Sequence, residues 1–344
     1  MKVAALVQKP YDLLNVLEYL HLQGWSRKQL TVFLIGKHSN VLAAERLCRA
    51  LKISVEHLAD PDIYGQWVVG LTAAQFPKGK ALLALKALLL VPSFFWWHIC
   101  WLYMRLRRRR ATYDVLLYDP WRSKCFFLSS IAADRQVLFD GGYSTITYKL
   151  CDAFASGGAR ELVATSLRAQ KTHVPWLVRT AFMRRVDKQA PFFTCYAGQV
   201  PSSSRFLVLA NNYAYSRATA AAVEMGDYAM VLGIPMLRHI DHYIEVAREC
   251  LQNADIAVTD ESVQYRFHPQ DLNRSKLDTV YAQMLEEGIA YRSLSCNFPE
   301  YGLEFDFLFF ERLPRFIVTY ESSSTVWLQQ VFGTRIELKI LQVR

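Results

Sequence analysis

Short apolar runs alternate with amphipathic stretches along the first part of the chain. Uninterrupted apolar runs predict strands with both faces covered, and leucines that recur every three or four positions predict helices. The predicted strands are 3–7, 30–35, 53–58, 113–118 and 136–139, and the predicted helices are 11–22 and 41–51. Alternation at this spacing predicts a parallel sheet with helices on its faces, and therefore an α/β domain.

A second set of the same kind follows a loop-rich stretch, 188–204. Here the predicted strands are 206–210, 228–232, 256–259, 265–268 and 316–319, and the predicted helices are 240–252, 276–287 and 323–332. The chain is long enough for two domains, which we place at 1–195 and 205–344. Both are predicted to be Rossmann-like, and they would face a central cleft.

The most apolar segment, 81–104, carries only Lys86 and His98 as strongly polar residues in 24 positions. It is long enough to span a bilayer, but Pro92 lies at its midpoint and basic residues at both ends remove the charge asymmetry that orients a span. The pattern favours two half-helices that lie in one leaflet of an anionic membrane. Within this membrane-associating segment, 78–110, the residues expected at the lipid surface are Trp96, Trp97, Arg105, Arg107, Arg108, Arg109 and Arg110. A true span, a buried helical hairpin and a homodimer interface are the alternatives.

Composition narrows the class of protein. With 52% hydrophobic and 21% charged residues the chain is too apolar to be disordered, and its net charge of +9 indicates an anionic partner. No nucleic acid is expected, because the basic run lies beside an apolar segment and is not interleaved with aromatic residues on a strand surface. Seven cysteines without a CxxC pair predict neither a disulfide scaffold nor a zinc site, and they suggest a reducing cytosol. The apolar run at the N-terminus is too short for a signal-peptide core.

Three candidate sites follow predicted strands, where ligands of parallel α/β sheets bind. Asp140 ends an apolar strand and precedes Gly141 and Gly142, two residues that allow a close backbone approach. The carboxylate is a candidate general base, and the alternative is a turn that Asp140 caps.

The second candidate is His268, which precedes Pro269. Proline disfavours helix at the residue before it, so the imidazole would be presented at the strand tip, where it can serve as a general acid. A half-buried structural histidine is the alternative.

The third candidate is the run Ser322, Ser323 and Ser324 between a strand and a helix. Hydroxyls together with the free N–H groups of a helix start suit a phosphate, whereas an ordinary N-cap needs one serine only. Upstream, Glu304 is a candidate to accept hydrogen bonds from a ribose diol, and a solvated acid is its alternative.

Taken in order, these residues resemble the motifs of the bacterial GT-B sialyltransferases, the lipooligosaccharide sialyltransferase family and the related polysialyltransferases. Asp140-Gly141-Gly142 stands in the place of an acid-acid-Gly motif, His268-Pro269 in that of a His-Pro motif, and the serine run in that of a Ser-Ser motif. The stretch VLGIPM (231–236), which contains Gly233, resembles the first strand of the family's second domain.

The resemblance implies a GT-B fold and an inverting, metal-independent glycosyltransferase without a cofactor. Its donor would be a CMP-activated sugar, sialic acid or a related nonulosonic acid. Its acceptor would be a glycolipid or oligosaccharide of the lipopolysaccharide or capsule type, at the cytoplasmic face of a bacterial inner membrane, where the enzyme would be peripheral or monotopic.

The resemblance also implies roles for single residues. Asp140 would deprotonate the acceptor hydroxyl and His268 would protonate the leaving phosphate. The implied donor-binding residues are Gly141, Gly142, Gly233, Pro269, Glu304, Ser322, Ser323 and Ser324, with Glu304 on the ribose and Ser322 and Ser323 on the phosphate.

One departure from the family pattern concerns the first motif, in which Gly141 stands where a second acid is expected. The departure leaves open whether Asp140 alone suffices as base and whether the donor is CMP-Kdo. A UDP-sugar is a further alternative, but no basic residue flanks the serine run to hold a second phosphate. An alternative of another class is a non-catalytic, basic, membrane-bound protein.

Overall fold

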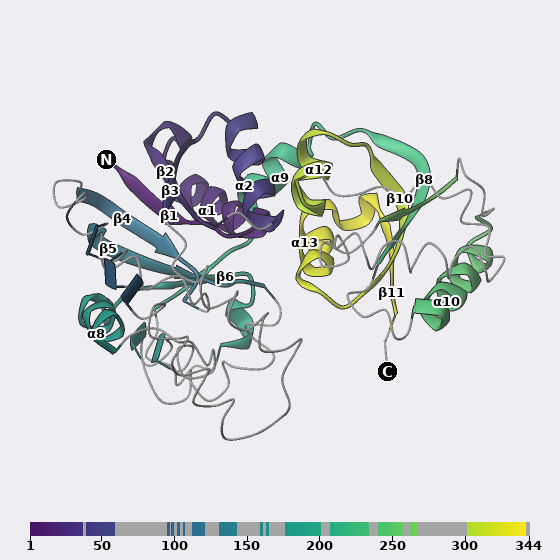
Figure 1. Ribbon diagram of the computed structural model, residues 1–344. Helices are drawn as coiled ribbons and strands as arrows, with labels where there is room; N and C mark the ends of the chain where they lie inside the picture. The colour runs from purple at the N-terminus through teal and green to yellow at the C-terminus, as the bar shows by residue number, and fades with distance from the viewer. Residues whose placement is uncertain are drawn as a thin grey trace, which may run out of the picture. The chain divides into compact units, whose positions relative to one another are not determined.

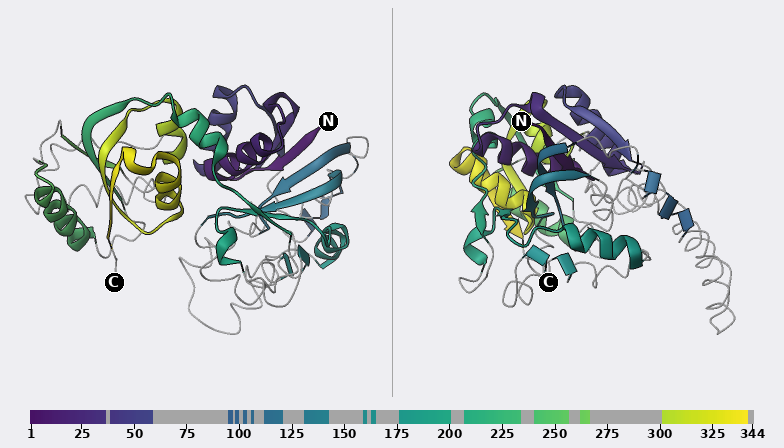
Figure 2. Two further views of the ribbon diagram at one scale, coloured as in Figure 1. Left: turned by 180° about the vertical axis from the view of Figure 1, so that it is seen from behind. Right: turned by 90° about the vertical axis from the view of Figure 1, so that its left-hand side faces the viewer.

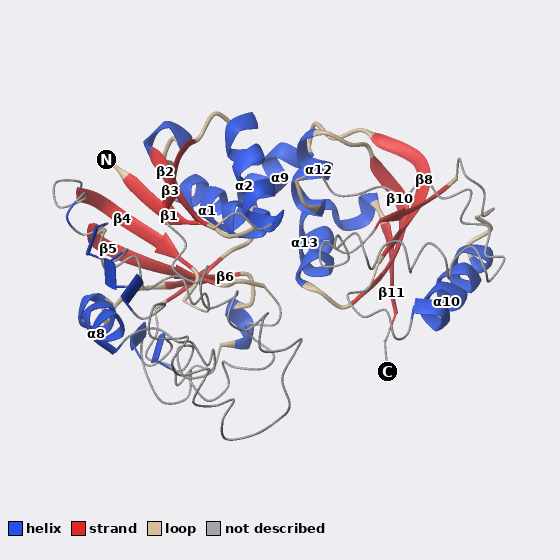
Figure 3. Ribbon diagram, viewed as in Figure 1, coloured by secondary structure: helices blue, strands red, loops and turns tan. Residues whose placement is uncertain are grey.

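The protein forms two compact units, Met1–Asn211 and Asn212–Arg344, each of which contains helices and parallel strands (Figures 1 and 3). The computed structural model describes residues 1–36, 39–58, 95–96, 98–99, 102–103, 106, 112–120, 131–142, 159–160, 163–164, 176–200, 207–233, 240–256, 262–266 and 301–341.

The first unit is built on a parallel sheet of seven described strands in the order β3-β2-β1-β4-β5-β6-β7. β2 and then β3 are added on one side of β1. The next strand in the chain, β4, pairs with β1 on its other side. The strand order therefore reverses between β1 and β4, which is the switch point where ligands of such sheets bind. The strands are β1 (Val3–Leu6), β2 (Leu30–Ile35), β3 (Ser54–Leu58), β4 (Thr112–Tyr118), β5 (Ala132–Phe139), β6 (Phe192–Thr194) and β7 (Val208–Ala210).

Helix α1 (Pro10–Leu22) begins three residues after β1. Pro10 occupies its first position, where a backbone N–H has no partner within a helix, so the proline costs nothing there. Every residue from Pro10 to Leu20 is buried, and the helix is therefore enclosed on all sides. The other described helices of this unit are α2 (Ser39–Ala50), α8 (Trp176–Arg185) and the short 3-10 turns η1 (Arg27–Gln29) and η3 (Ala197–Gln199).

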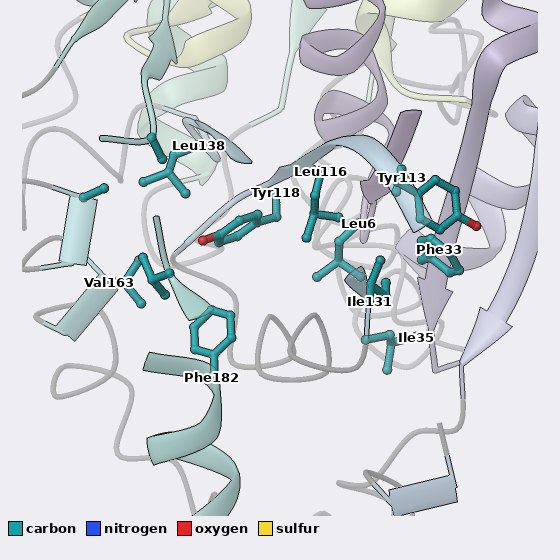
Figure 4. Close-up of a cluster of buried hydrophobic side chains, with 14 of the residues drawn as sticks. Leu6, Phe33, Ile35, Tyr113, Leu116, Tyr118, Ile131, Leu138, Val163 and Phe182 are labelled. Atoms are coloured by element: carbon teal, nitrogen blue, oxygen red, sulfur yellow. The ribbon is translucent and has the colours of Figure 1, made fainter. Parts of the chain in front are cut away.

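A cluster of buried apolar side chains forms the core beside the sheet of the first unit (Figure 4). It includes Leu6, Phe33, Leu116 and Leu138 from four neighbouring strands. Phe182 of α8 meets the ring of Tyr118 edge-on, with 6.2 Å between the ring centroids, so α8 closes this part of the core. Removal of this apolar surface from water is the main force that holds helix and sheet together.

The second unit contains a parallel sheet of four described strands in the order β11-β10-β8-β9, which Figure 2 shows from two further directions. The strands are β8 (Met225–Leu232), β9 (Val263–Arg266), β10 (Leu313–Tyr320) and β11 (Glu337–Leu341). The helices are α9 (Ala214–Ala220), α10 (Ile240–Asn253), α12 (Leu303–Phe309), α13 (Ser323–Phe332) and the 3-10 turn η7 (Gly333–Arg335). Trp327 of α13 is fully buried and donates a 3.2 Å hydrogen bond to Ser216 Oγ of α9.

The predicted class, an α/β protein with two Rossmann-like units, is confirmed by these two parallel sheets. The strand at 30–35 and the helix at 323–332 have the predicted bounds. The stretch 188–204, predicted as loop, contains β6. The strand predicted within 206–210 exists as β7, but it pairs with β6 and so belongs to the first sheet. The first unit ends one residue later, at Asn211. Strands of three residues are too short to show a period, and here pairing with a neighbour defines them.

Three other predicted elements differ from the structure or lie wholly or partly outside the described residues. The strand predicted at 265–268 runs over 263–266, with its N–H and C=O groups paired to β8. The helix predicted at 276–287 lies outside the described residues, as do positions 257–259 of the strand predicted at 256–259.

Candidate functional site

Asp140 directly follows β5 at the carboxyl edge of the first sheet, and its side chain is completely buried. One carboxylate oxygen, Oδ1, accepts a 3.1 Å hydrogen bond from the Gly142 N–H, and Oδ2 accepts one of 3.3 Å from the Cys195 N–H. Gly142 has a φ of +114°, which glycine adopts without strain, and this turn aims its N–H at Asp140. The hydrogen bond from the Gly142 N–H is the contact expected if Asp140 only caps a turn.

Burial raises the pKa of Asp140 to about 6, although hydrogen bonds from Thr194, Gly142 and Cys195 and the charge of Lys9 act in the opposite direction. The Lys9 ammonium group donates to the Gly141 carbonyl. A carboxyl whose pKa lies close to neutrality is suited to take up and release a proton at working pH. The assignment of Asp140 as the base stays a prediction, as do the roles of Gly141 and Gly142.

Helix α1 contributes a row of buried polar side chains that we did not predict: Asp12, Asn15 and Glu18. Asn15 Nδ2 donates a 2.9 Å hydrogen bond to the Asp140 carbonyl, and Asn15 Oδ1 accepts one of 3.0 Å from Asn211 Nδ2. The signal was present in the sequence, since polar residues at intervals of three share one face of a helix that is otherwise apolar.

In the second unit, two predicted positions, Gly233 and the serine run, lie at the carboxyl edge of the sheet. Gly233 follows β8, and its N–H donates a 2.7 Å hydrogen bond to the Arg266 carbonyl at the end of β9. The serine run follows β10, the other neighbour of β8. Since the strands are parallel, their carboxyl ends lie at one edge.

Ser322 and Ser324, at the start of helix α13, form different hydrogen bonds. Ser322 is the N-cap, and its Oγ accepts a 3.3 Å hydrogen bond from the Thr325 N–H. Ser324 Oγ donates a 2.7 Å hydrogen bond to Oε1 of Glu304, a buried residue in the first turn of α12. The N-cap alternative therefore accounts for the first serine and not for the third. The structure brings Glu304 and the serine run together.

Arg266, the last residue of β9, is buried and forms ion pairs with two carboxylates. Its guanidinium donates at 2.7 Å to Asp306 of α12 and at 2.7 and 2.8 Å to the two oxygens of Glu311. Burial raises the pKa of Asp306 to about 7, against the lowering effect of Arg266. This cluster fastens the end of β9 to the helix that carries Glu304. His268 and Pro269, which follow β9 in the sequence, lie outside the described residues.

The apolar segment 81–104 is described at a few helical positions only. Trp96 is partly buried against the core of the first unit, so the protein itself covers much of this side chain. Five apolar side chains at intervals of one to four residues are at least half exposed: Phe95, Ile99, Leu102, Tyr103 and Leu106. Pro92, Trp97, Arg105 and Arg107–Arg110 lie outside the described residues.

Within the described ranges, no helix combines the length and apolar character needed to cross a membrane. The same ranges hold no group of three or more histidine, cysteine, aspartate or glutamate side chains that could bind a metal ion.

The two parallel sheets define an α/β protein with two Rossmann-like units and polar clusters at the carboxyl edge of each sheet. No protein-family model and no curated protein matches the chain. Among solved structures it is similar to UDP-GlcNAc 2-epimerase from Methanocaldococcus jannaschii. The TM-score is 0.43, the sequence identity is 10%, and the match covers 100% of this chain and 84% of that one.

Proposed function

We propose that the protein is an inverting glycosyltransferase that moves a nonulosonic acid, such as sialic acid, from its CMP-activated form to a hydroxyl of a glycolipid or surface glycan. The observation that carries the proposal is the carboxyl edge of the second sheet. There the N-terminus of α13 and the carboxylate of Glu304 are joined by the Ser324 hydrogen bond.

The start of α13 is suited to the single phosphate of CMP. Ser322 engages the N–H groups of Thr325 and Val326, through its hydroxyl and its carbonyl respectively. The N–H groups of Ser323 and Ser324 come earlier in the helix and have no helical carbonyl to bind. Together with the positive end of the helix dipole, they favour an anion at this position.

Glu304 is suited to the ribose. Ser324 occupies one of its carboxylate oxygens and holds the side chain in place, and a carboxylate accepts further hydrogen bonds from vicinal hydroxyls. Because the Ser324 hydroxyl is hydrogen-bonded to Glu304, the phosphate in this proposal is bound by Ser322, Ser323 and the N–H groups at the start of the helix. A nucleoside monophosphate would thus contact two helices.

The transfer itself needs a base and an acid. The acceptor oxygen attacks the anomeric carbon and gives its proton to Asp140, while the bond from that carbon to the phosphate oxygen breaks. The electron pair leaves with the phosphate, and His268 supplies a proton to it. For this step Asp140 Oδ1 exchanges its bond with Gly142 for one with the acceptor hydroxyl. CMP-Kdo would use the same groups, whereas a UDP-sugar would bring a second phosphate.

The nucleotide assignment is tested by thermal unfolding with CMP, UDP and GDP, since a ligand that binds only the folded state raises the melting temperature. We expect CMP to stabilise the wild type and to stabilise Glu304→Gln much less. Glu337→Gln is the matched control, because Glu337 is exposed and begins β11 at the opposite end of the strands. A response to UDP without one to CMP would contradict the proposal, as would an equal CMP response in both variants.

For the location, we propose that the first unit binds the cytoplasmic face of a bacterial inner membrane through an apolar stripe, defined as Phe95, Ile99, Leu102, Tyr103 and Leu106. Large side chains exposed together on a helical segment mark a surface that binds a partner. Arg105 and Arg107–Arg110 lie next to the stripe in the sequence, and such residues favour anionic lipid.

Sedimentation with vesicles tests the membrane proposal. We expect the wild type to bind phosphatidylglycerol-containing vesicles, and the double variant Ile99→Asp/Leu106→Asp to lose this binding. Leu207→Asp is the control, because Leu207 is equally exposed in the same unit but lies outside the stripe. Unchanged vesicle binding by the double variant would refute the proposal. Conversion of a dimer into a monomer would favour the dimer-interface alternative.

A further inference from the structure

Gln8 and Asp12 lie at the turn between β1 and α1, beside the switch point of the first sheet. Both side chains are buried, with 7% and 1% of their surface exposed. The backbone N–H of Gln8 donates a 2.9 Å hydrogen bond to Asp12 Oδ2, which fixes the carboxylate against the turn. The remaining atoms, Gln8 Nε2 and Asp12 Oδ1, have no hydrogen-bond partner among the described residues.

The two unpartnered atoms are complementary to one hydroxyl group. An amide nitrogen donates, and a carboxylate oxygen accepts. A hydroxyl both accepts and donates, so it is the kind of group that suits an amide donor together with a carboxylate acceptor. Buried polar groups in folded proteins are nearly always satisfied, and a pair left open in this way indicates a bound group.

This pair lies next to Asp140. Lys9 and Asn15 of the same segment contact Gly141 O and Asp140 O respectively. Asp12 is three residues from each of them, and residues three apart on a helix are neighbours. In the chain, Asp12 therefore lies midway between the two residues, Lys9 and Asn15, whose contacts join this segment to the end of β5. The helical spacing marks Asp12 as polar, but no local motif links it to Asp140, which follows more than a hundred residues later.

We propose that Gln8 and Asp12 bind a hydroxyl of the acceptor sugar beside Asp140, so that α1 provides the second carboxylate that the first motif lacks at Gly141. The inference rests on the proposed function, since it assigns the acceptor side of that reaction. Asp12 accepts a hydrogen bond and takes no proton.

The test compares Gln8→Ala, Asp12→Asn and the control Gln23→Ala, which changes an exposed residue at the other end of α1. Gln8→Ala keeps the backbone N–H that binds Asp12, so the fold is retained. With CMP-sialic acid and a panel of fluorescent hexose and heptose glycosides, we expect the KM for the best acceptor to rise roughly tenfold or more in both site variants. The KM for CMP-sialic acid and its hydrolysis without acceptor should stay at wild-type values.

Acceptors that lack one hydroxyl sharpen the test. For the wild type, an acceptor without the bound hydroxyl should have a higher KM than the complete acceptor. For Gln8→Ala the same change should have little further effect on KM, because the amide that binds this hydroxyl is already absent. A buried water between the two atoms would instead lower stability in the variants and leave the acceptor KM unchanged, and that result would overturn the inference. A wild type that accepts no glycoside of the panel would also count against it. Failure of CMP to stabilise the wild type refutes the proposed function itself.

Discussion

Ser324 and Glu304 join the first turns of two helices, α13 and α12, by a 2.7 Å hydrogen bond. The acceptor is a buried carboxylate and the donor hydroxyl is half-buried, so water replaces the bond poorly if either group is removed. This contact thus contributes both to the stability of the second unit and to the geometry of its carboxyl edge.

We expect Ser324→Ala to lower the free energy of unfolding by about 1–3 kcal/mol, the range for a hydrogen bond to a buried carboxylate. Urea denaturation of Ser324→Ala, Glu304→Gln and the double variant separates the pair from its surroundings. The double variant should be less destabilised than the sum of the single ones by about 1 kcal/mol or more. Effects that add within ~0.5 kcal/mol would show that the two side chains do not interact.

The raised pKa of Asp140 predicts a pH dependence of stability. Its value of about 6 in the folded protein lies above the ordinary value of 3.8, so the folded state holds the proton more tightly. The stability that this group contributes is complete below pH ~4 and is lost as the pH rises through 6. Over this window the wild type should lose roughly 3 kcal/mol relative to Asp140→Asn, which cannot ionise.

Urea unfolding at pH 4, 5, 6 and 7 measures this difference. Asp134→Asn, at an exposed position of β5, is the control and should follow the wild-type profile. Ionisation of Asp306 changes the free energy of unfolding of all three proteins equally, so it cancels in the differences between them. Parallel profiles for the wild type and Asp140→Asn would contradict the prediction.

In the transfer reaction, Asp140→Asn should abolish turnover and leave CMP binding nearly intact, and retained turnover would remove Asp140 from the mechanism.

Arg266→Met should destabilise the second unit by about 3–5 kcal/mol near neutral pH, because the buried Asp306 and the partly buried Glu311 lose the guanidinium that pairs with both. The loss should shrink as the pH falls below 7, where Asp306 takes up a proton. Arg312→Met is the matched control, since Arg312 forms an exposed ion pair with Glu224 and its removal should cost under ~1 kcal/mol. Equal losses in the two variants would disprove this account of the cluster.

Gly142→Ala should cost about 1–3 kcal/mol, because a φ of +114° strains any residue that carries a Cβ. The turn should also hold its N–H less well against Asp140. Gly198→Ala provides the comparison, because its φ is not positive and no atom lies within 4 Å of the added Cβ. Thermal unfolding of both variants decides the point, and an unchanged melting temperature for Gly142→Ala would mean that the turn adapts.

The sequence predicts best where one local signal decides the structure. The apolar run Leu30–Ile35 and the serine before Ser323–Phe332 define their elements without help from distant residues. The strand Phe192–Thr194 has no such signal, since three residues show no period and pairing with β5 and β7 holds it in place. Through this strand β7 also joins the first sheet, and the first unit therefore reaches Asn211.

The candidate site follows the same division. Glu304 and the serines were predicted from the residue types that suit a nucleotide, and the structure brings Glu304 into contact with Ser324. Arg266 was not predicted as part of the site. Its partner Asp306 is 40 residues away, and neither local sequence indicates that the two side chains form an ion pair. Asp12 and Asn15 were counted only as part of an apolar helix, although their spacing placed them on one face.

The Arg266 cluster has a consequence for how this chain can change over generations. A substitution of Arg266 alone leaves the buried Asp306 without its ion-pair partner and removes the guanidinium from Glu311. A substitution of either acid alone removes part of the charge that balances the buried Arg266. Neutral drift at these positions therefore requires paired or triple replacement. Among related chains, Arg266, Asp306 and Glu311 should be inherited as one block, or be replaced together by apolar residues of similar volume.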